Sequence, residues 1–333
     1  MLSRASFLRM FAATSVSVAL QRTARSATWP SQPIKLVVPF AAGGPTDAVA
    51  RFLAENLRRV LGQSVVVENR AGAQGAVGTV AVKDAQPDGY TLLLHEIPGT
   101  FAILPAMTPK PSYDGKLDFT PISMVASGPI FLLVRSDLPA KNLEELVAYS
   151  KTVPGGINYG SSGGMGQMPT HMGPEIFKLK SGLIARNIVY RGASPALVDL
   201  AAGRVDFMMT TGLGAAMGFL DSGKVRVLAV TSRERQPFYK DAPTFAESGF
   251  AVPELENGTI FGLLGPAGLP PDIVATLSEA VRKVLASAEF EAQLGPLMMA
   301  PFAKGGPEVL AHILDSEISS WVPVVRKLNL QSN

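Results

Sequence analysis

The chain has 333 residues, of which 47% are apolar and 17% are charged, and it contains no cysteine. At about 150 residues per domain, this length predicts two domains, and the apolar content excludes disorder throughout the chain. The lack of cysteine excludes disulfides, thiol nucleophiles and Cys-ligated metal centres. The 32 glycines and 26 prolines indicate many turns, as alternating β and α units require.

The N-terminal segment 1–27 is typical of an export signal. Two arginines give it a positive start, the apolar stretch 11–20 follows, and small residues stand at a suitable cleavage site. This stretch is far shorter than the ~20 residues of a membrane-spanning helix. The segment 3–8 is similar to a twin-arginine signal but lacks the second arginine, so both the general and the twin-arginine export routes stay open. We therefore expect a periplasmic protein, cleaved near Ser26/Ala27.

Removal of the signal changes the charge of the chain. Residues 1–26 hold four arginines and no acidic residue, so the formal net charge falls from +3 to −1. Proteins that bind nucleic acid carry a basic face, and a near-neutral surface therefore does not indicate nucleic-acid binding. No later segment has the length of a membrane span without glycine, proline or charge, so we expect a soluble mature protein.

Strands and helices alternate after the signal. Apolar runs at 34–39, 64–68 and 90–94 predict three buried strands. Between the first two, apolar residues recur on one helical face, with Thr46 as the expected N-cap and Gly62 as the end of the helix. A glycine-rich turn and a shorter helix separate the second and third runs. This βαβαβ order predicts a mostly parallel sheet.

The same alternation begins again after a proline-rich stretch. Asn142 opens a capping-box-like helix start, and Ser194 with Pro195 suits an N-cap and first helical position. The tail from Pro270 reads as helical. We expect strands at 130–134, 157–159, 187–190, 205–209 and 225–231, and helices at 142–151, 168–178, 194–203 and 308–328.

The loop from Phe40 to Asp47 joins a strand to a helix N-terminus. Free backbone N–H groups and the helix dipole favour an anion there, and its two glycines allow close approach to the backbone. A tight connection with an ordinary helix cap is the alternative. The loop is neither a Walker motif nor a G-x-G-x-x-G motif, so a nucleotide is not expected.

The segment 160–164, Gly-Ser-Ser-Gly-Gly, matches the G-x-S-x-G pattern of α/β-hydrolases between a strand and a helix. Ser162 would be the nucleophile of such an enzyme. Of the three histidines His95, His171 and His312, only the last fits the usual chain order, and nothing around it supports that role. Hydroxyl and backbone donors for a bound anion are the other interpretation, and the one we favour.

The three histidines lie far apart in the sequence and show no metal-binding spacing, so we expect no metal and no cofactor. His95 differs from the others because it stands at the C-terminal end of a predicted strand. Open α/β sheets bind their ligands at such ends.

At these loops the sequence resembles the solute receptors of tripartite tricarboxylate transporters, the Bug-type periplasmic binding proteins. The matching stretches occur in family order after the signal. They are 29–40, 42–47 (Ala-Gly-Gly-Pro-Thr-Asp), 65–70 (Val-Val-Val-Glu-Asn-Arg), 87–92 (Pro-Asp-Gly-Tyr-Thr-Leu), 228–231 and 266–268.

This resemblance implies an α/β, two-lobed periplasmic-binding-protein type II fold, with mixed, mainly parallel sheets and helices on both faces. Lobe 1 would comprise 28–128 plus 231–333, and lobe 2 would comprise 129–230. Two crossing strands would join the lobes, and the ligand would lie between them.

In such receptors, backbone and hydroxyl donors hold the carboxylate of the ligand, partly through water. The positions that the resemblance implies as ligand-binding are Phe40, Ala42, Gly43, Gly44, Thr46, Asp47, His95, Gly160, Ser161, Ser162, Gly163, Gly164, Thr170, Arg191, Gly192, Ala193 and Thr210.

Two departures from the family affect the ligand. The third strand ends in His-Glu-Ile-Pro at 95–98, where many members have serine and threonine, and Thr210-Thr211 replaces an aspartate or asparagine. An amino-acid ligand is therefore less expected, and citrate-like, C4-dicarboxylic and aromatic carboxylates all stay open.

The expected function is that of a monomeric receptor and not of an enzyme. It would bind a small carboxylate and dock on a membrane permease with a small accessory subunit. A periplasmic sensor that serves a signalling kinase and a serine hydrolase that uses Ser162 are the alternatives.

Overall fold

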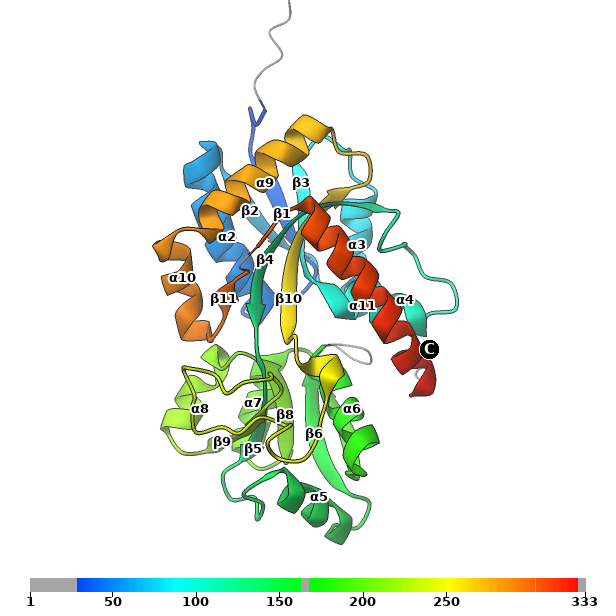
Figure 1. Ribbon diagram of the computed structural model, residues 1–333, viewed down its shortest axis with the longest axis vertical. Coiled ribbons are helices and arrows are strands. Elements are labelled where there is room, and N and C mark those ends of the chain that lie inside the picture. The colour runs from blue at the N-terminus through cyan, green and yellow to red at the C-terminus, as the bar shows by residue number, and fades with distance from the viewer. Residues whose placement is uncertain (1–28, 163–167, 303, 329–333) are drawn as a thin grey trace, which may run out of the picture.

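The computed structural model describes residues 29–162, 168–302 and 304–328. Its strands form two sheets, one of six strands in the order β11-β4-β10-β3-β1-β2 and one of five in the order β7-β6-β8-β5-β9. Figure 1 shows the six-stranded first sheet with its helices in the upper half and the second sheet in the lower half. The predicted α/β class with mixed sheets is confirmed.

The first sheet is built from both ends of the chain. Parallel β1, β2 and β3 form one side, and β10 pairs antiparallel with both β3 and β4. Its strands are β1 (Ile34–Val38), β2 (Val65–Asn69), β3 (Thr91–Glu96), β4 (Phe119–Gly128), β10 (Thr259–Pro266) and β11 (Ala300–Pro301). The helices around it are α2 (Pro45–Leu61), α3 (Ala76–Lys83), α4 (Leu104–Met107), α9 (Pro271–Leu285), α10 (Ala288–Leu294) and α11 (Pro307–Lys327).

Helices cover both faces of this sheet. Successive side chains of a strand point to opposite faces, so neighbouring residues pack against different helices. Leu36 packs in a cluster with residues of α2 and α9, whereas its neighbour Val37 packs with residues of α3 and α11. Leu263 and Leu264 of β10 divide in the same way. Burial on both faces explains why these strands are continuous apolar runs in the sequence.

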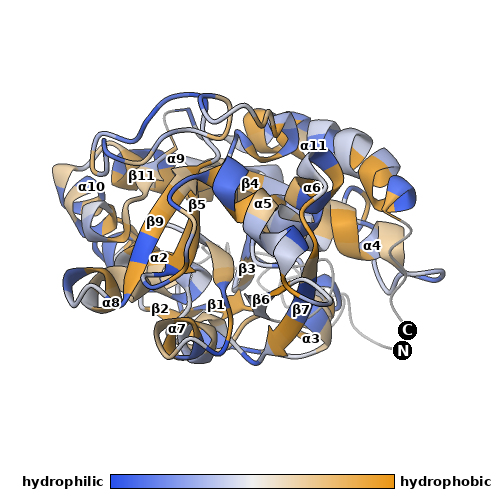
Figure 2. Ribbon diagram, turned by 90° about the horizontal axis from the view of Figure 1, so that it is seen from below, coloured by the Kyte–Doolittle hydropathy of each residue, from blue (hydrophilic) through white to orange (hydrophobic). Residues whose placement is uncertain are grey.

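The second sheet is mixed as well. β6 runs parallel to β7 and β8, and β5 pairs antiparallel with β8 and β9. Strands β5 and β9 are mostly orange in the hydropathy view of Figure 2. The elements are β5 (Ile130–Arg135), α5 (Leu143–Thr152), β6 (Ile157–Ser162), α6 (Met172–Ser181), β7 (Ala185–Tyr190), α7 (Ala193–Ala201), β8 (Phe207–Thr211), α8 (Met217–Asp221) and β9 (Val225–Val230).

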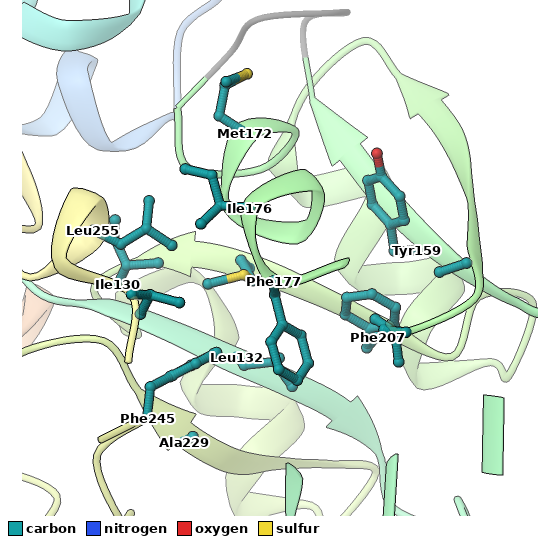
Figure 3. Close-up of a cluster of buried hydrophobic side chains, with 14 of the residues drawn as sticks. Ile130, Leu132, Tyr159, Met172, Ile176, Phe177, Phe207, Ala229, Phe245 and Leu255 are labelled. Carbon is teal, nitrogen blue, oxygen red and sulfur yellow. The ribbon is translucent and has the colours of Figure 1, made fainter. Parts of the chain in front are cut away.

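A large apolar core lies on one face of this second sheet. Figure 3 shows side chains of β5, β6, β8 and α6 in one cluster, including Leu132 and Phe207. The Phe177 ring on α6 meets the Phe245 ring edge-on, with 5.2 Å between the centroids. Phe245 comes from the segment after β9, so that segment completes the core of the second sheet.

The chain passes between the two sheets along β4 and β10, which pair along most of their length (Figure 1). β4 ends at Gly128, and β5 of the second sheet begins at Ile130. We expected the return near residue 231, yet the chain rejoins the first sheet only at Thr259, where β10 begins. Residues 231–258 instead supply Phe245 and other apolar side chains to the core of the second sheet. The lobe boundaries stay a prediction.

Several expected boundaries were wrong by a few residues. The helix after β1 begins at Pro45 with Gly44 as its N-cap, and not at Thr46, because proline suits the first helical position. α7 likewise takes Gly192 as its N-cap instead of Ser194. Helix α6 begins at Met172 and not at 168, after a turn over 168–171.

β6 runs through Ser162, so the first three residues of the G-x-S-x-G match lie in a strand and not in a turn. Its fourth and fifth residues, Gly163 and Gly164, lie outside the described residues, as does the expected signal with its cleavage site. Within the described ranges, no helix combines the length and apolarity needed to cross a membrane.

Candidate ligand-binding site

A cavity of about 290 Å³ is lined by residues attached to both sheets. The first sheet supplies the loop after β1, the end of β3 and Phe261 of β10, and the second supplies the ends of β6, β7 and β8. Its lining residues are Phe40, Ala41, Ala42, Gly43, Gly44, Pro45, Thr46, Glu96, Ser162, Met168, Pro169, Thr170, Arg191, Gly192, Ala193, Ser194, Pro195, Thr210, Thr211 and Phe261.

The glycine loop, residues 40–46, forms one wall and leads into α2. Gly43 has a φ of +86° and Gly44 is the N-cap of the helix, so the backbone turns sharply with no side chain between it and the cavity. The first N–H groups of a helix have no partner within the helix, and the helix dipole favours an anion beside them. This wall can therefore receive a negatively charged group.

Asp47 holds this loop from behind and does not line the cavity. Its carboxylate accepts hydrogen bonds from the Gly43 N–H at 2.9 Å, from Asn69 Nδ2 at 2.9 Å and from Arg51. Burial raises the pKa of Asp47, but the hydrogen bonds from Arg51, Gly43 and Asn69 outweigh burial, and the pKa lies below its usual value. Asn69 also donates to the Phe40 carbonyl. Asp47 therefore shapes the loop as an ionised support.

The end of β6 faces the glycine loop across the cavity. The Ser162 N–H donates to Thr170 Oγ1 at 3.0 Å, and the two hydroxyl oxygens lie 3.3 Å apart. The preceding Ser161 is fully buried and donates to Asn187 Oδ1 at 2.6 Å. Ser162 and Thr170 thus offer hydroxyl groups to a ligand, whereas Ser161 and Gly160 lie outside the cavity lining.

The third wall is the start of α7, residues 191–195. Gly192 is the N-cap of this helix, and Arg191 is exposed. Arg191 is the one basic side chain among the residues that line the cavity, and within the described chain it forms no ion pair. Helix N–H groups and a guanidinium on this wall both favour an anionic ligand.

His95 lies behind the wall formed by the loop, not in the lining of the cavity. Its ring is completely buried, hydrogen-bonds Thr100 and meets the Phe40 ring edge-on, with 5.0 Å between the centroids. Burial lowers the pKa of His95 to about 3, so the ring is neutral at physiological pH. It supports Phe40, whose ring does line the cavity.

The next residue of the strand, Glu96, lines the cavity and is only 6% exposed. Burial raises the pKa of its carboxyl group to about 8. The position of His95 at a strand end had indicated that residue and not Glu96, although the departure from the serine- and threonine-rich pattern at 95–98 was a signal for both.

The structure brings most of the expected site residues together around one cavity. Those that line it are Phe40, Ala42, Gly43, Gly44, Thr46, Ser162, Thr170, Arg191, Gly192, Ala193 and Thr210. Lining residues that were not expected from the sequence include the apolar Met168, Pro169 and Phe261, which come from a turn and from β10.

No group of three or more histidine, aspartate or glutamate side chains in the described ranges could hold a metal ion. The polar groups around the cavity are hydroxyls, helix N-termini, one guanidinium and one carboxyl. This set is chemically suited to bind and orient an organic anion.

Comparison with known proteins agrees with this chemistry. The sequence profile of the family described as "Tripartite tricarboxylate transporter family receptor" matches residues 49–330. Protein BugT of Bordetella pertussis is 34% identical over 300 residues, which cover 90% of this chain and 90% of that protein.

Two solved structures give the same result. MatC from Rhodopseudomonas palustris with bound malate has a TM-score of 0.80 and 33% identity, over 89% of this chain and 100% of that one. A second R. palustris protein, with adipate, has a TM-score of 0.83 and 32% identity, over 91% of this chain and 99% of that one. The chain therefore belongs to the tripartite tricarboxylate transporter receptors, the Bug-type periplasmic solute-binding proteins.

Proposed function

We propose that this receptor captures a small dicarboxylate, or a related organic acid, in the 290 Å³ cavity and delivers it to a tripartite transporter. The observation that carries the proposal is the convergence of two helix N-termini, the hydroxyl groups of Ser162, Thr170 and Thr210, and Arg191 on one cavity. The related structures that hold malate and adipate favour a dicarboxylate.

Binding proceeds by closure of two lobes around the ligand. The lobes are those that the resemblance implies, 28–128 plus 231–333 and 129–230, with residues 231–258 packed on the second sheet. A ligand that bridges walls attached to different sheets favours the closed arrangement, and hinge motions of this kind occur at a few residues between packed units. Closure removes water, so the hydrogen bonds to the anion become stronger.

The receptor acts as a periplasmic monomer, after removal of the signal near Ser26/Ala27, and passes its ligand to a permease with a small accessory subunit. It catalyses no reaction of its own. In support of this, the Ser162 hydroxyl faces Thr170, and His95 is engaged by Thr100 behind the cavity wall.

A thermal-shift and calorimetry screen of the mature chain, residues 28–333, tests the proposal. The panel contains malate, adipate, citrate and aromatic carboxylates, with the matching amides and amino acids as controls. A carboxylate at a hundred times its dissociation constant should stabilise the fold by about 2.7 kcal/mol, and its amide should not. If no carboxylate shifts the melting temperature while an ester is hydrolysed, the receptor function is wrong and the hydrolase alternative is right.

A further inference from the structure

Glu96 is a buried carboxyl group with an unused hydrogen-bonding atom in the wall of the cavity. The side chain is 6% exposed, and its Oε1 is buried with no hydrogen-bond partner in the described chain. Buried polar atoms are almost always paired, and each exception calls for a specific explanation. Because Glu96 lines the cavity, a ligand bound there can supply the hydrogen bond that the carboxyl group does not form within the described chain.

The carboxyl group of Glu96 has apolar neighbours and packs directly against Gly99. A Cβ atom at Gly99 would lie 2.7 Å from Glu96 Oε1, so the carboxyl group occupies the space that the missing side chain leaves. On β10, Phe261 is the register partner of Glu96, and Met168 lines the same cavity. These neighbours neither donate a hydrogen bond to the carboxyl group nor compensate a negative charge on it.

The ionisable groups nearby do not compensate a negative charge on Glu96 either. Neither β10 nor the loop 40–46 carries an ionisable side chain, and the same holds for 162–170 by sequence. Arg191 lies on the α7 wall and is exposed to solvent. Burial lowers the pKa values of His95 and His171, so both rings are neutral above pH 7.

Asp47 lies behind the loop, outside the cavity lining, and forms an ion pair with Arg51. Among the residues that line the cavity, Glu96 has the one carboxyl group. With the desolvation of this group uncompensated, its pKa rises to about 8.

We propose that Glu96 is a specificity-determining residue that, in its protonated form, donates a hydrogen bond to the second carboxylate of a dicarboxylate ligand. The proposal deepens the function proposed above and rests on it. A protonated carboxyl group is a donor, as are the hydroxyls, the helix N–H groups and the guanidinium around it. An ionised Glu96 would instead face the ligand with a like charge and no cation between them.

This arrangement makes binding depend on a proton. Aliphatic dicarboxylates, with carboxyl pKa values of about 4, are fully ionised between pH 7 and 9. The ligand requires the protonated receptor, so its affinity should be nearly constant below the pKa of Glu96 and fall about tenfold per pH unit above it. Binding should also take up about half a proton per ligand at pH 8 and close to one at pH 9.5, because the complex holds the proton that the free receptor has lost.

Isothermal titration calorimetry with malate and adipate, at pH 6.5, 7.5, 8.5 and 9.5, measures both effects. Pairs of buffers with different ionisation enthalpies give the number of protons exchanged. The variant Glu96→Gln keeps an N–H donor that cannot ionise, so its affinity should be the same at all four pH values. Glu254→Gln is the matched control, because the Glu254 carboxylate also has a buried atom without a partner in the described chain but lies outside the cavity. This control should keep the wild-type pH profile.

The outcomes separate this proposal from the function on which it rests. If malate or adipate binds equally well from pH 6.5 to 9.5, or Glu96→Gln keeps the wild-type profile, the role of Glu96 is wrong and the carboxylate receptor stands. Proton release on binding, with amino acids preferred, would show that Glu96 pairs with an ammonium group and would also overturn it. If no carboxylate of the panel binds at any pH, the proposed function itself fails.

Discussion

Asp47 Oδ2 accepts the backbone N–H of Gly43 at 2.9 Å, across the first turn of α2. This hydrogen bond fixes the glycine loop in the shape that exposes the helix N-terminus to the cavity. Asn69, at the end of β2, donates to the same carboxylate and to the Phe40 carbonyl, so the loop is tied to two elements. The site is thus organised before any ligand arrives, which lowers the entropic cost of binding.

Asp47→Ala should weaken both the fold and the site. The Gly43 N–H and Asn69 would lose their acceptor in a position that is only 4% exposed, which should cost about 2–3 kcal/mol of stability. Adipate affinity should fall about tenfold as the loop loosens. Arg51→Ala is the control, since the Arg51 side chain is 54% exposed and its ion pair should be worth about 1 kcal/mol or less. Urea unfolding and calorimetry measure both, and equal effects of the two substitutions would contradict this role of Asp47.

Glu96→Gln should stabilise the free protein in a pH-dependent way. The folded-state pKa of about 8 lies above the ordinary value of 4.5, so the folded state binds the proton more tightly than the unfolded state. The contribution of Glu96 to stability is therefore fully present below pH 4.5 and decreases as the pH rises to about 8, by roughly 5 kcal/mol in total. Glutamine removes this loss, so the difference in unfolding free energy between variant and wild type should grow from pH 5 to pH 8. A constant difference over that range would show that the group is not desolvated.

Ser161→Ala and Ser162→Ala should separate stability from binding. Ser161 is fully buried and donates to Asn187, so its loss should cost about 1–2 kcal/mol of stability and leave adipate affinity unchanged. Ser162 lines the cavity, so its loss should lower adipate affinity about fivefold with a smaller change in stability. Neither variant should differ from wild type in background esterase activity. Loss of esterase turnover in Ser162→Ala alone would favour the hydrolase alternative.

Gly258→Ala should strongly destabilise the junction between the sheets. Gly258 precedes β10 with a φ of +68°, and a Cβ atom there would lie 2.3 Å from the Gly128 carbonyl oxygen at the end of β4. The clash and the strained φ together should cost about 3 kcal/mol or more. Gly62→Ala is the matched control, because its φ is +70° and a Cβ atom would meet nothing within 4 Å. That control should cost about 1 kcal/mol, and similar losses for both in urea unfolding would refute the close contact.

The local elements of this fold could be predicted from the sequence. Apolar runs such as that in β1 become strands because the sheet is buried on both faces, and the Asn142 cap with Glu145 starts α5 as its pattern indicates. The long crossing strands β4 and β10 could not be predicted in the same way. They pair with each other, with β11 and with β3, and each of these pairings joins segments more than 100 residues apart. Their register is a property of the assembled sheet.

The walls of the cavity show the same division. The sequence alone indicated the glycine loop and Ser162, because each follows a predicted strand, and the family resemblance added Thr170 and Arg191. The tertiary structure alone decided which face of β3 meets the cavity. His95 and Glu96 are adjacent, and side chains alternate along a strand, so the two point to opposite faces of the first sheet. His95 shares its face with Leu93 and packs against Phe101 behind the loop, which leaves Glu96 as the residue that lines the cavity.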